Sequence, residues 1–148
     1  QEWRRSIRFH EPLAAVMIDV DHFKPYNDTR GHLAGDDCLR RIAGAVAEGL
    51  TRGGDFVARY GGEEFIGLIS GVDGAGLAEV AEKLRAGIEA LQIPHGASPV
   101  SPWVTVSIGA AISRPTPEAP PSSLIQAADQ QLYTAKQLGR NRISLAGV

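Results

Sequence analysis

The sequence is poor in cysteine: Cys38 is the only one among its 148 residues. A single cysteine cannot form an internal disulfide, and it excludes a zinc site built from cysteine pairs. Proteins without disulfides are typical of reducing compartments. We therefore expect this domain to reside in the cytoplasm.

The sequence also lacks a strong charge of either sign and a long hydrophobic run. Its formal net charge is −2, so there is no general positive field to attract nucleic acid or an anionic membrane. The longest uninterrupted apolar run, Leu13 to Ile18, is far shorter than a membrane span. We expect neither a nucleic-acid partner nor membrane contact by this domain itself, and any phosphate site must be built locally.

No signal peptide is visible at the start of the chain, which opens at Gln1 rather than at a methionine. We interpret residues 1–148 as one domain excised from a longer protein. The parent protein would carry an N-terminal sensory or regulatory domain, and it could be anchored in a membrane.

Hydrophobic patterns predict alternating strands and helices. In chain order, the expected elements are a buried strand (13–20), a Gly- and Asn-containing stretch (27–35), a helix (39–50), two strands (56–60 and 64–70), a helix (77–91), a half-buried strand (104–112), a helix (125–135) and a short strand (142–145). Gly61-Gly62 suits a tight hairpin turn. Ser122 or Ser123 could cap the last helix, and Gly139 is a plausible end for it. This order predicts an α+β or mixed α/β fold, with helices covering a mostly antiparallel sheet.

Two groups of carboxylates stand out. Asp19-Val20-Asp21 ends the buried strand, where an ionised carboxylate is costly unless it is paired or binds a cation; the alternative is an aspartate that caps the next turn. Glu63-Glu64 follows the glycine turn, where paired acids are often solvated surface. A hairpin laid beside the first strand would bring Glu63 near Asp19, and converging oxygen ligands suit Mg²⁺ or Mn²⁺. Adjacent strand residues point to opposite faces, so Glu63 and Glu64 should have different roles.

The same residues resemble the motifs of a known family. The segment Arg59-Tyr60-Gly61-Gly62-Glu63-Glu64-Phe65 is similar to the signature of GGDEF domains, in its GGEEF form. Upstream and downstream matches follow at the family's spacing: Asp19-Val20-Asp21-His22-Phe23-Lys24, Asn27-Asp28, Gly31-His32, Gly35-Asp36, Ala128-Asp129, Tyr133, Ala135-Lys136 and Gly139-Arg140-Asn141. The resemblance covers about Leu13 to Ile143. It implies a fold like that of nucleotidyl cyclases and polymerase palms, with a ferredoxin-like central sheet flanked by helices.

The resemblance implies a metal-dependent diguanylate cyclase, which joins two GTP molecules into cyclic di-GMP. Asp19 and Glu63 would bind Mg²⁺ or Mn²⁺, helped by the backbone carbonyl of Val20. Glu64 would lie in the catalytic cluster and aid deprotonation of the ribose 3′-hydroxyl. Because each domain would bind one GTP, the active species would be a homodimer.

The resemblance also implies contacts to the nucleotide. Asn27 and Asp36 would bind guanine, although Asp36 could instead be a helix N-cap. Lys24, Lys136 and Arg140 would bind the β- and γ-phosphates, with backbone N–H groups of His22 and Phe23 adding contacts. For Lys136 and Arg140 the alternative is a favourable interaction with a helix dipole.

A second site is implied just before the hairpin. Arg52 and Asp55 match an R-x-x-D motif at which cyclic di-GMP inhibits the family's enzymes, and an exposed turn is the alternative. The position that aligns with a further arginine of this site is Lys83, which keeps the charge but loses the bidentate fork. The chain also lacks the family's N-terminal Asp-x-Leu-Thr stretch and Asn-Arg pair, so the fragment is expected to be less active than its parent.

Three competing interpretations remain open at this stage. The first is a catalytically silent module that binds GTP or cyclic di-GMP. The second is a different nucleotidyl cyclase or a polymerase palm, which ATP against GTP turnover would distinguish. The third, a purely structural interaction domain, does not explain the ordered acids, lysines and arginine.

Overall fold

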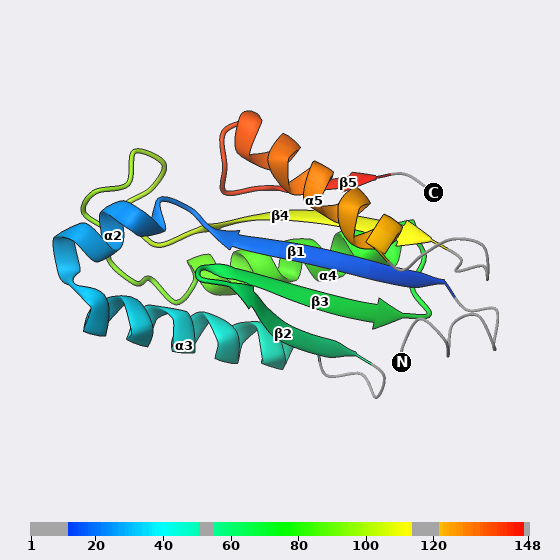
Figure 1. Ribbon diagram of the computed structural model, residues 1–148, viewed down its shortest axis with the longest axis horizontal. Coiled ribbons are helices and arrows are strands. Elements are labelled where there is room, and N and C mark those ends of the chain that lie inside the picture. Colours follow the sequence, from blue (N-terminus) through cyan, green and yellow to red (C-terminus); the bar gives the residue numbers. More distant parts are fainter. Residues whose placement is uncertain (1–11, 51–54, 114–121, 147–148) are drawn as a thin grey trace.

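The computed structural model describes residues 12–50, 55–113 and 122–146. These residues form β1 (Leu13–Val20), α2 (Phe23–Arg30), α3 (His32–Gly49), β2 (Phe56–Gly61), β3 (Glu64–Ser70), α4 (Gly74–Glu89), β4 (Val106–Ser113), α5 (Ser122–Gln137) and β5 (Ile143–Ala146). Figure 1 shows α5 in front of a central sheet and α4 behind it. None of the helices within the described ranges is long and apolar enough to cross a membrane.

The strands form one sheet in the order β2-β3-β1-β4-β5. The central strand β1 is antiparallel to both β3 and β4, and β2 is antiparallel to β3. Only the β4–β5 pair among the described strands is parallel. The expected α+β fold with a mostly antiparallel sheet is confirmed.

Two hydrophobic cores lie on opposite faces of this sheet. On one face, Val16 and Ile18 of β1 pack with residues of α3 and α4. On the other face, Ala15 and Met17 pack with α5. Every residue of β1 is buried as a result, because neighbouring strands cover its edges and helices cover both of its faces.

Strand β4 departs from its expected half-buried character. All its residues except Ser113 are buried, because α5 covers the face that carries Ser107, Gly109 and Ala111. At Gly109 the approach is very close: a Cβ there would lie 2.0 Å from the backbone nitrogen of Leu132. The small residues of this strand therefore face a closely packed helix and not solvent.

Helix α2 was not expected from the sequence. It overlaps residues 27–30 of the Gly- and Asn-containing stretch expected over 27–35, and α3 already begins at His32. Pro25 is tolerated in the first helical turn because its missing N–H has no partner there anyway. Phe23 and Tyr26 are buried, with their rings stacked at 5.9 Å, and this burial offsets the poor helix propensity of the polar residues that follow.

The alternative of Asp36 as a helix N-cap is wrong. Gly31, with φ 88°, precedes the first residue of α3, so Asp36 lies inside the helix. The remaining elements agree with the sequence to within a few residues. The hairpin turns between Gly61 and Glu64, and Gly139 follows α5 with φ 127°.

Candidate functional site

A pocket of about 190 Å³ lies at the end of β1 where the chain turns into α2. Three parts of the chain build it: the β1–α2 junction, the turn of the β2–β3 hairpin, and the end of α5 with the turn after it. Its lining residues are Asp19, Val20, Asp21, His22, Phe23, Lys24, Pro25, Glu63, Lys136 and Arg140. The pocket thus unites acidic and basic side chains that are far apart in sequence.

Asp19 is a buried carboxylate with one satisfied oxygen. Its Oδ2 accepts a hydrogen bond from the Lys136 ammonium. Its Oδ1 is buried and has no hydrogen-bond partner among the described residues. Burial raises the pKa of this carboxyl, and the Lys136 charge only partly opposes the rise. Such a group gains from a nearby cation.

Asp21 has the opposite character, although it lies only two residues further on. Its oxygens accept hydrogen bonds from Thr105 Oγ1 at 2.8 Å, Ser107 Oγ at 2.6 Å and the backbone N–H of Asn141 at 3.0 Å. A carboxylate held this way joins β1, β4 and the turn after α5. The hydrogen bonds of Asp21 therefore go to distant segments and not to the next turn, so they do not match the turn-capping alternative.

Glu63 and Glu64 have different surroundings, as expected. The Glu63 carbonyl accepts from the Val20 N–H at 3.2 Å, and the residue lines the pocket. Glu64 faces Asp19 across the β1–β3 pair but lies outside the pocket lining. Burial, followed by the negative charge of Asp19, raises the pKa of both glutamates.

These donors fit a hard divalent cation. No cluster of three or more Asp, Glu, His or Cys side chains arranged for a metal occurs in the described part of the chain. The expected set needs only two carboxylates and a backbone carbonyl, because Mg²⁺ keeps waters or substrate phosphates as its other ligands. The unpaired Asp19 Oδ1 beside Glu63 is the feature that fits such an ion.

Three cationic side chains line the same pocket. Lys24 is exposed and pairs with Asp28 at 3.2 Å, and Lys136 lies in the last turn of α5. Arg140 follows in a left-handed backbone conformation with φ 65°. Lys136 could also interact with the helix dipole, but its ammonium contacts Asp19 inside the pocket.

The N-terminus of α2 contributes backbone groups. His22 has φ 51° and no side chain in the described ranges caps this helix end, so its first N–H groups are open to an anion. The His22 carbonyl is held by His95 Nε2 at 2.9 Å, while His95 Nδ1 accepts from the Ala97 N–H at 3.2 Å. Both contacts are satisfied by a neutral His95 ring with its proton on Nε2.

The two residues expected to contact guanine, Asn27 and Asp36, are not among the residues that line the pocket. Asn27 is on α2, and its buried Oδ1 has no hydrogen-bond partner within 12–50, 55–113 and 122–146. It lies against Gly35, where a Cβ would come within 1.8 Å of that oxygen. Asp36, the residue that follows Gly35, is exposed. A volume of about 190 Å³ is smaller than typical ligand pockets and suits the phosphates rather than a whole nucleotide.

The expected inhibition site is only partly covered by the described residues. Arg52 lies outside the described residues. Asp55 precedes β2 and is partly buried, and Lys83 is exposed on α4. The interpretation of these three residues as one site stays a prediction.

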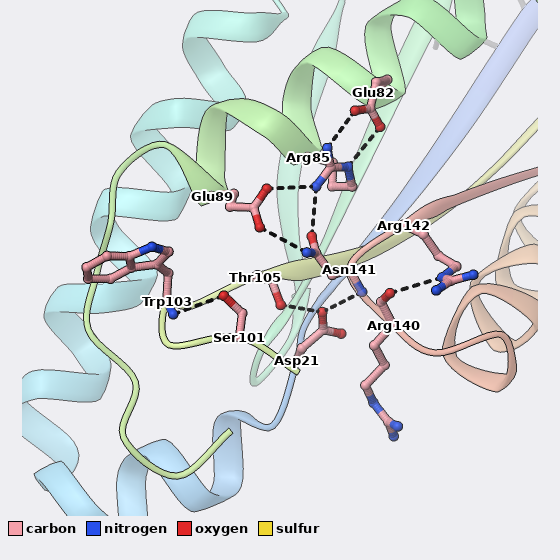
Figure 2. Close-up of polar contacts among 10 residues, drawn as sticks. All are labelled: Asp21, Glu82, Arg85, Glu89, Ser101, Trp103, Thr105, Arg140, Asn141 and Arg142. Atoms are coloured by element: carbon pink, nitrogen blue, oxygen red, sulfur yellow. Dashed lines mark hydrogen bonds and ion pairs between the residues drawn. The ribbon is translucent and has the colours of Figure 1, made fainter. Parts of the chain in front are cut away.

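A polar network that links Asp21 to helix α4 through Asn141 was not expected from the sequence. Figure 2 shows Asn141 between Asp21 and the helix residues Arg85 and Glu89. Arg85 Nη1 donates to Asn141 Oδ1 at 2.8 Å, and Asn141 Nδ2 donates to Glu89 Oε2 at 3.0 Å. Asn141 belongs to a motif noted in the sequence, but its partners lie 52 and 56 positions away, so no local pattern indicates them.

Comparison with known proteins gives a consistent result. The family model described as "Diguanylate cyclase, GGDEF domain" matches residues 1–142. Diguanylate cyclase A of Treponema denticola is 40% identical over 136 residues, which are 92% of this chain and 36% of that protein. Diguanylate cyclase DosC of Escherichia coli K12 is 40% identical over 145 residues, 98% of this chain and 31% of that protein. The chain spans about a third of the length of these relatives.

Solved structures have the same fold. The GGDEF domain of DgcB from Caulobacter crescentus, in complex with c-di-GMP, has a TM-score of 0.85 at 28% identity, covering 97% of this chain and 83% of that one. The active GGEEF domain of a diguanylate cyclase from Vibrio cholerae has a TM-score of 0.81 at 28% identity, covering 97% and 88%. Both proteins resemble this chain over nearly its whole length.

Proposed function

This chain belongs to the GGDEF family of diguanylate cyclase domains, and from that premise we propose that it condenses two GTP molecules into cyclic di-GMP and two pyrophosphates. The observation that carries the proposal is the pocket in which Asp19 and Glu63 meet Lys24, Lys136 and Arg140. Carboxylates for a cation and cations for phosphates, side by side, are what a nucleoside triphosphate with its metal requires.

Asp19, Glu63 and the Val20 carbonyl would hold Mg²⁺ or Mn²⁺. When bound, the ion supplies positive charge that neutralises the triphosphate and the charge that develops in the transition state. The chain's own donors are suited to this because Asp19 Oδ1 has no other partner in the described structure. Burial is the main cause of the raised pKa of both Asp19 and Glu63, and the negative charge of Asp19 adds to the rise at Glu63.

The cationic residues would hold the phosphates. Lys136 and Arg140 approach from the end of α5, and Lys24 from α2. The first N–H groups of α2, at His22 and Phe23, would add uncharged donors at a helix N-terminus. These groups fix the triphosphate so that its α-phosphorus is presented to a second nucleotide.

Guanine selectivity would come from Asn27 and Asp36. The Asp36 carboxylate can accept from the N1–H and exocyclic amine of guanine, a pair of donors that adenine does not offer. Asn27 carries a buried oxygen with no partner among the described residues. Polar groups left unpaired by the wrong base cause strong discrimination, so ATP should be a poor substrate.

The reaction needs two such domains. The 3′-hydroxyl oxygen of one GTP attacks the α-phosphorus of the other, and pyrophosphate leaves. Glu64 is our candidate for receiving the hydroxyl proton, since it lies next to Asp19 in the β1–β3 register. A second, symmetric attack closes the ring. We infer a two-fold homodimer as the active species, with each protomer supplying one half-site.

Product inhibition and control belong to the proposal as well. Arg52, Asp55 and Lys83 would bind cyclic di-GMP, with Lys83 weakening the site relative to an arginine. A sensory or regulatory domain in the parent protein would set the dimer geometry. Because GTP is a cytoplasmic nucleotide, we assign the reaction to the cytoplasm.

Product identification tests the proposal. Purified domain incubated with GTP and Mg²⁺ should form cyclic di-GMP, detected by chromatography and mass spectrometry, and chelation of the metal or replacement of GTP by ATP should abolish it. Asp19→Asn and Glu64→Gln should each lose at least about 100-fold in turnover, whereas Glu79→Gln, an exposed acid on α4, should not. GTP binding without product would favour the silent binding module instead.

A further inference from the structure

The turn after α5 has an unusual backbone. Gly139, Arg140 and Asn141 have φ values of 127°, 65° and 47°, which puts three consecutive residues in the positive-φ region. Two of them are not glycine, and each such residue costs about 1–2 kcal/mol. A conformation of this kind persists only when its surroundings hold it. The turn matters because it directs Arg140 into the phosphate pocket.

Asn141 is held at three of its polar groups. Its backbone N–H donates to Asp21 Oδ2 at 3.0 Å. Its side-chain oxygen accepts from Arg85, and its side-chain nitrogen donates to Glu89. Figure 2 shows these contacts on one side of the turn, with the Arg140 side chain extending away from them.

Arg85 is in turn fixed on α4. Its guanidinium donates to Glu82 at 2.6 Å and to Glu89 at 3.1 Å, and only 16% of its side chain is exposed. Its Nε and Nη2 donate to Glu82, whereas its Nη1 donates to both Glu89 and Asn141. None of these α4 residues lines the pocket.

We propose that Arg85 and Asn141 are positioning residues, which lock the strained turn so that Arg140 is aimed at the phosphates of bound nucleotide. The inference rests on the proposed function only in naming nucleotide as the ligand. Neither residue touches the substrate, and each acts through Arg140. Helix α4 thereby becomes part of the site although it contributes no lining side chain.

A double-mutant cycle distinguishes positioning from general stability. The quantity measured is the dissociation constant of a non-hydrolysable GTP analogue with Mg²⁺, by calorimetry. Arg140→Met should weaken binding about 10–100-fold, as expected for a lost charge-assisted contact. Arg85→Met should weaken it up to about tenfold, yet add nothing in the Arg140→Met background. The matched control is Arg40→Met, an exposed arginine on α3 that pairs with Asp37, and it should change nothing.

Asn141→Gly provides a second variant if Arg85→Met does not fold. Glycine relieves the positive φ but removes both side-chain contacts, so binding should weaken while the melting temperature changes little. Effects of Arg85→Met and Arg140→Met that add independently would overturn the inference. So would a lowered melting temperature with unchanged affinity.

Hydrogen exchange keeps this test separate from that of the proposed function. Amides of residues 138–142 should exchange faster in Arg85→Met than in wild type or Arg40→Met, whether or not nucleotide binds. Unchanged protection there would contradict the positioning role by itself. A wild-type domain that fails to bind the analogue, with faster exchange in Arg85→Met, would instead contradict the proposed function.

Discussion

At the scale of single residues, Lys136 and Asp19 form an ion pair although we propose different ligands for them, a phosphate for Lys136 and a metal ion for Asp19. The ammonium contacts the carboxylate that we assign to the metal, and it lowers the pKa of that carboxyl against the effect of burial. Under the proposed function, a divalent ion at Asp19 would compete with the ammonium. Once that ion was bound, Lys136 would be available to a phosphate.

This competition predicts opposite effects of Lys136→Met on two ligands. Affinity for Mn²⁺ alone should rise severalfold, because a competing positive charge is removed from beside Asp19. Affinity for a GTP analogue with metal should fall about 10–100-fold, because a charge-assisted phosphate contact is lost. Electron paramagnetic resonance titration of Mn²⁺ and calorimetry of the nucleotide measure the two.

Arg40→Met is the control for the loss of a positive charge, since Arg40 is exposed on α3 and belongs to neither proposed site. It should leave both affinities unchanged. If Lys136→Met weakened binding of Mn²⁺ alone, Lys136 would be supporting the metal site and the competition would not exist.

Which residues of the site were predictable depends on how local their partners are. The acids and cations that line the pocket occur in short motifs, so their types and order indicate a metal and phosphate site. Without the family resemblance, the sequence could not distinguish Asp19 from Asp21, because both lie at the end of the same strand. Their difference comes from Thr105 and Ser107, which lie 84 and 86 positions from Asp21. The Asn141 contacts were missed for the same reason.

At the scale of elements, the packing of α5 on β4 positions two cationic residues of the site, Lys136 and Arg140. Helix α5 carries Lys136 and leads into the turn of Arg140, and its backbone passes directly over Gly109. A Cβ at Gly109 would lie 2.0 Å from the Leu132 nitrogen and 2.3 Å from the Ala128 carbonyl oxygen. Backbone atoms cannot rotate away as a flexible side chain can, so the helix would have to move.

Gly109→Ala should therefore cost stability and function together. We expect the free energy of unfolding to fall by about 3 kcal/mol, with nucleotide affinity falling as well because Lys136 and Arg140 move with the helix. Gly44→Ala is the matched control: Gly44 is exposed in α3 with nothing within 4 Å of an added Cβ, and alanine there should add about 1 kcal/mol. Denaturant unfolding measures both, and a neutral Gly109→Ala would contradict the close packing.

The elements that sequence predicted well are those with a strong hydrophobic period. β1, the hairpin and the three longer helices follow from such patterns. Helix α2 did not, since only Phe23 and Tyr26 of its residues are buried and its remaining positions are polar. The burial of β4 on both faces was missed because small residues under a close helix look like small residues facing solvent.

At the scale of the whole molecule, each domain would bind one GTP at the proposed site, whereas the proposed product needs two. The rate of cyclic di-GMP formation should therefore rise faster than linearly with protein concentration over the range in which the dimer dissociates. Initial rates across a dilution series, compared with the sedimentation of the same samples, measure this. Strictly linear dependence across that range would contradict the scheme of two half-sites.

The central claim is that Asp19 and Glu63 share a divalent ion in the pocket. Crystals of the domain with Mn²⁺ and a non-hydrolysable GTP analogue, measured near the manganese absorption edge, locate that ion directly. We predict an anomalous peak roughly 2.0–2.2 Å from a carboxylate oxygen of each residue, distances typical of such octahedral ions, with the triphosphate beside Lys136 and Arg140. A peak elsewhere, or nucleotide bound with the two carboxylates turned apart, would contradict the account.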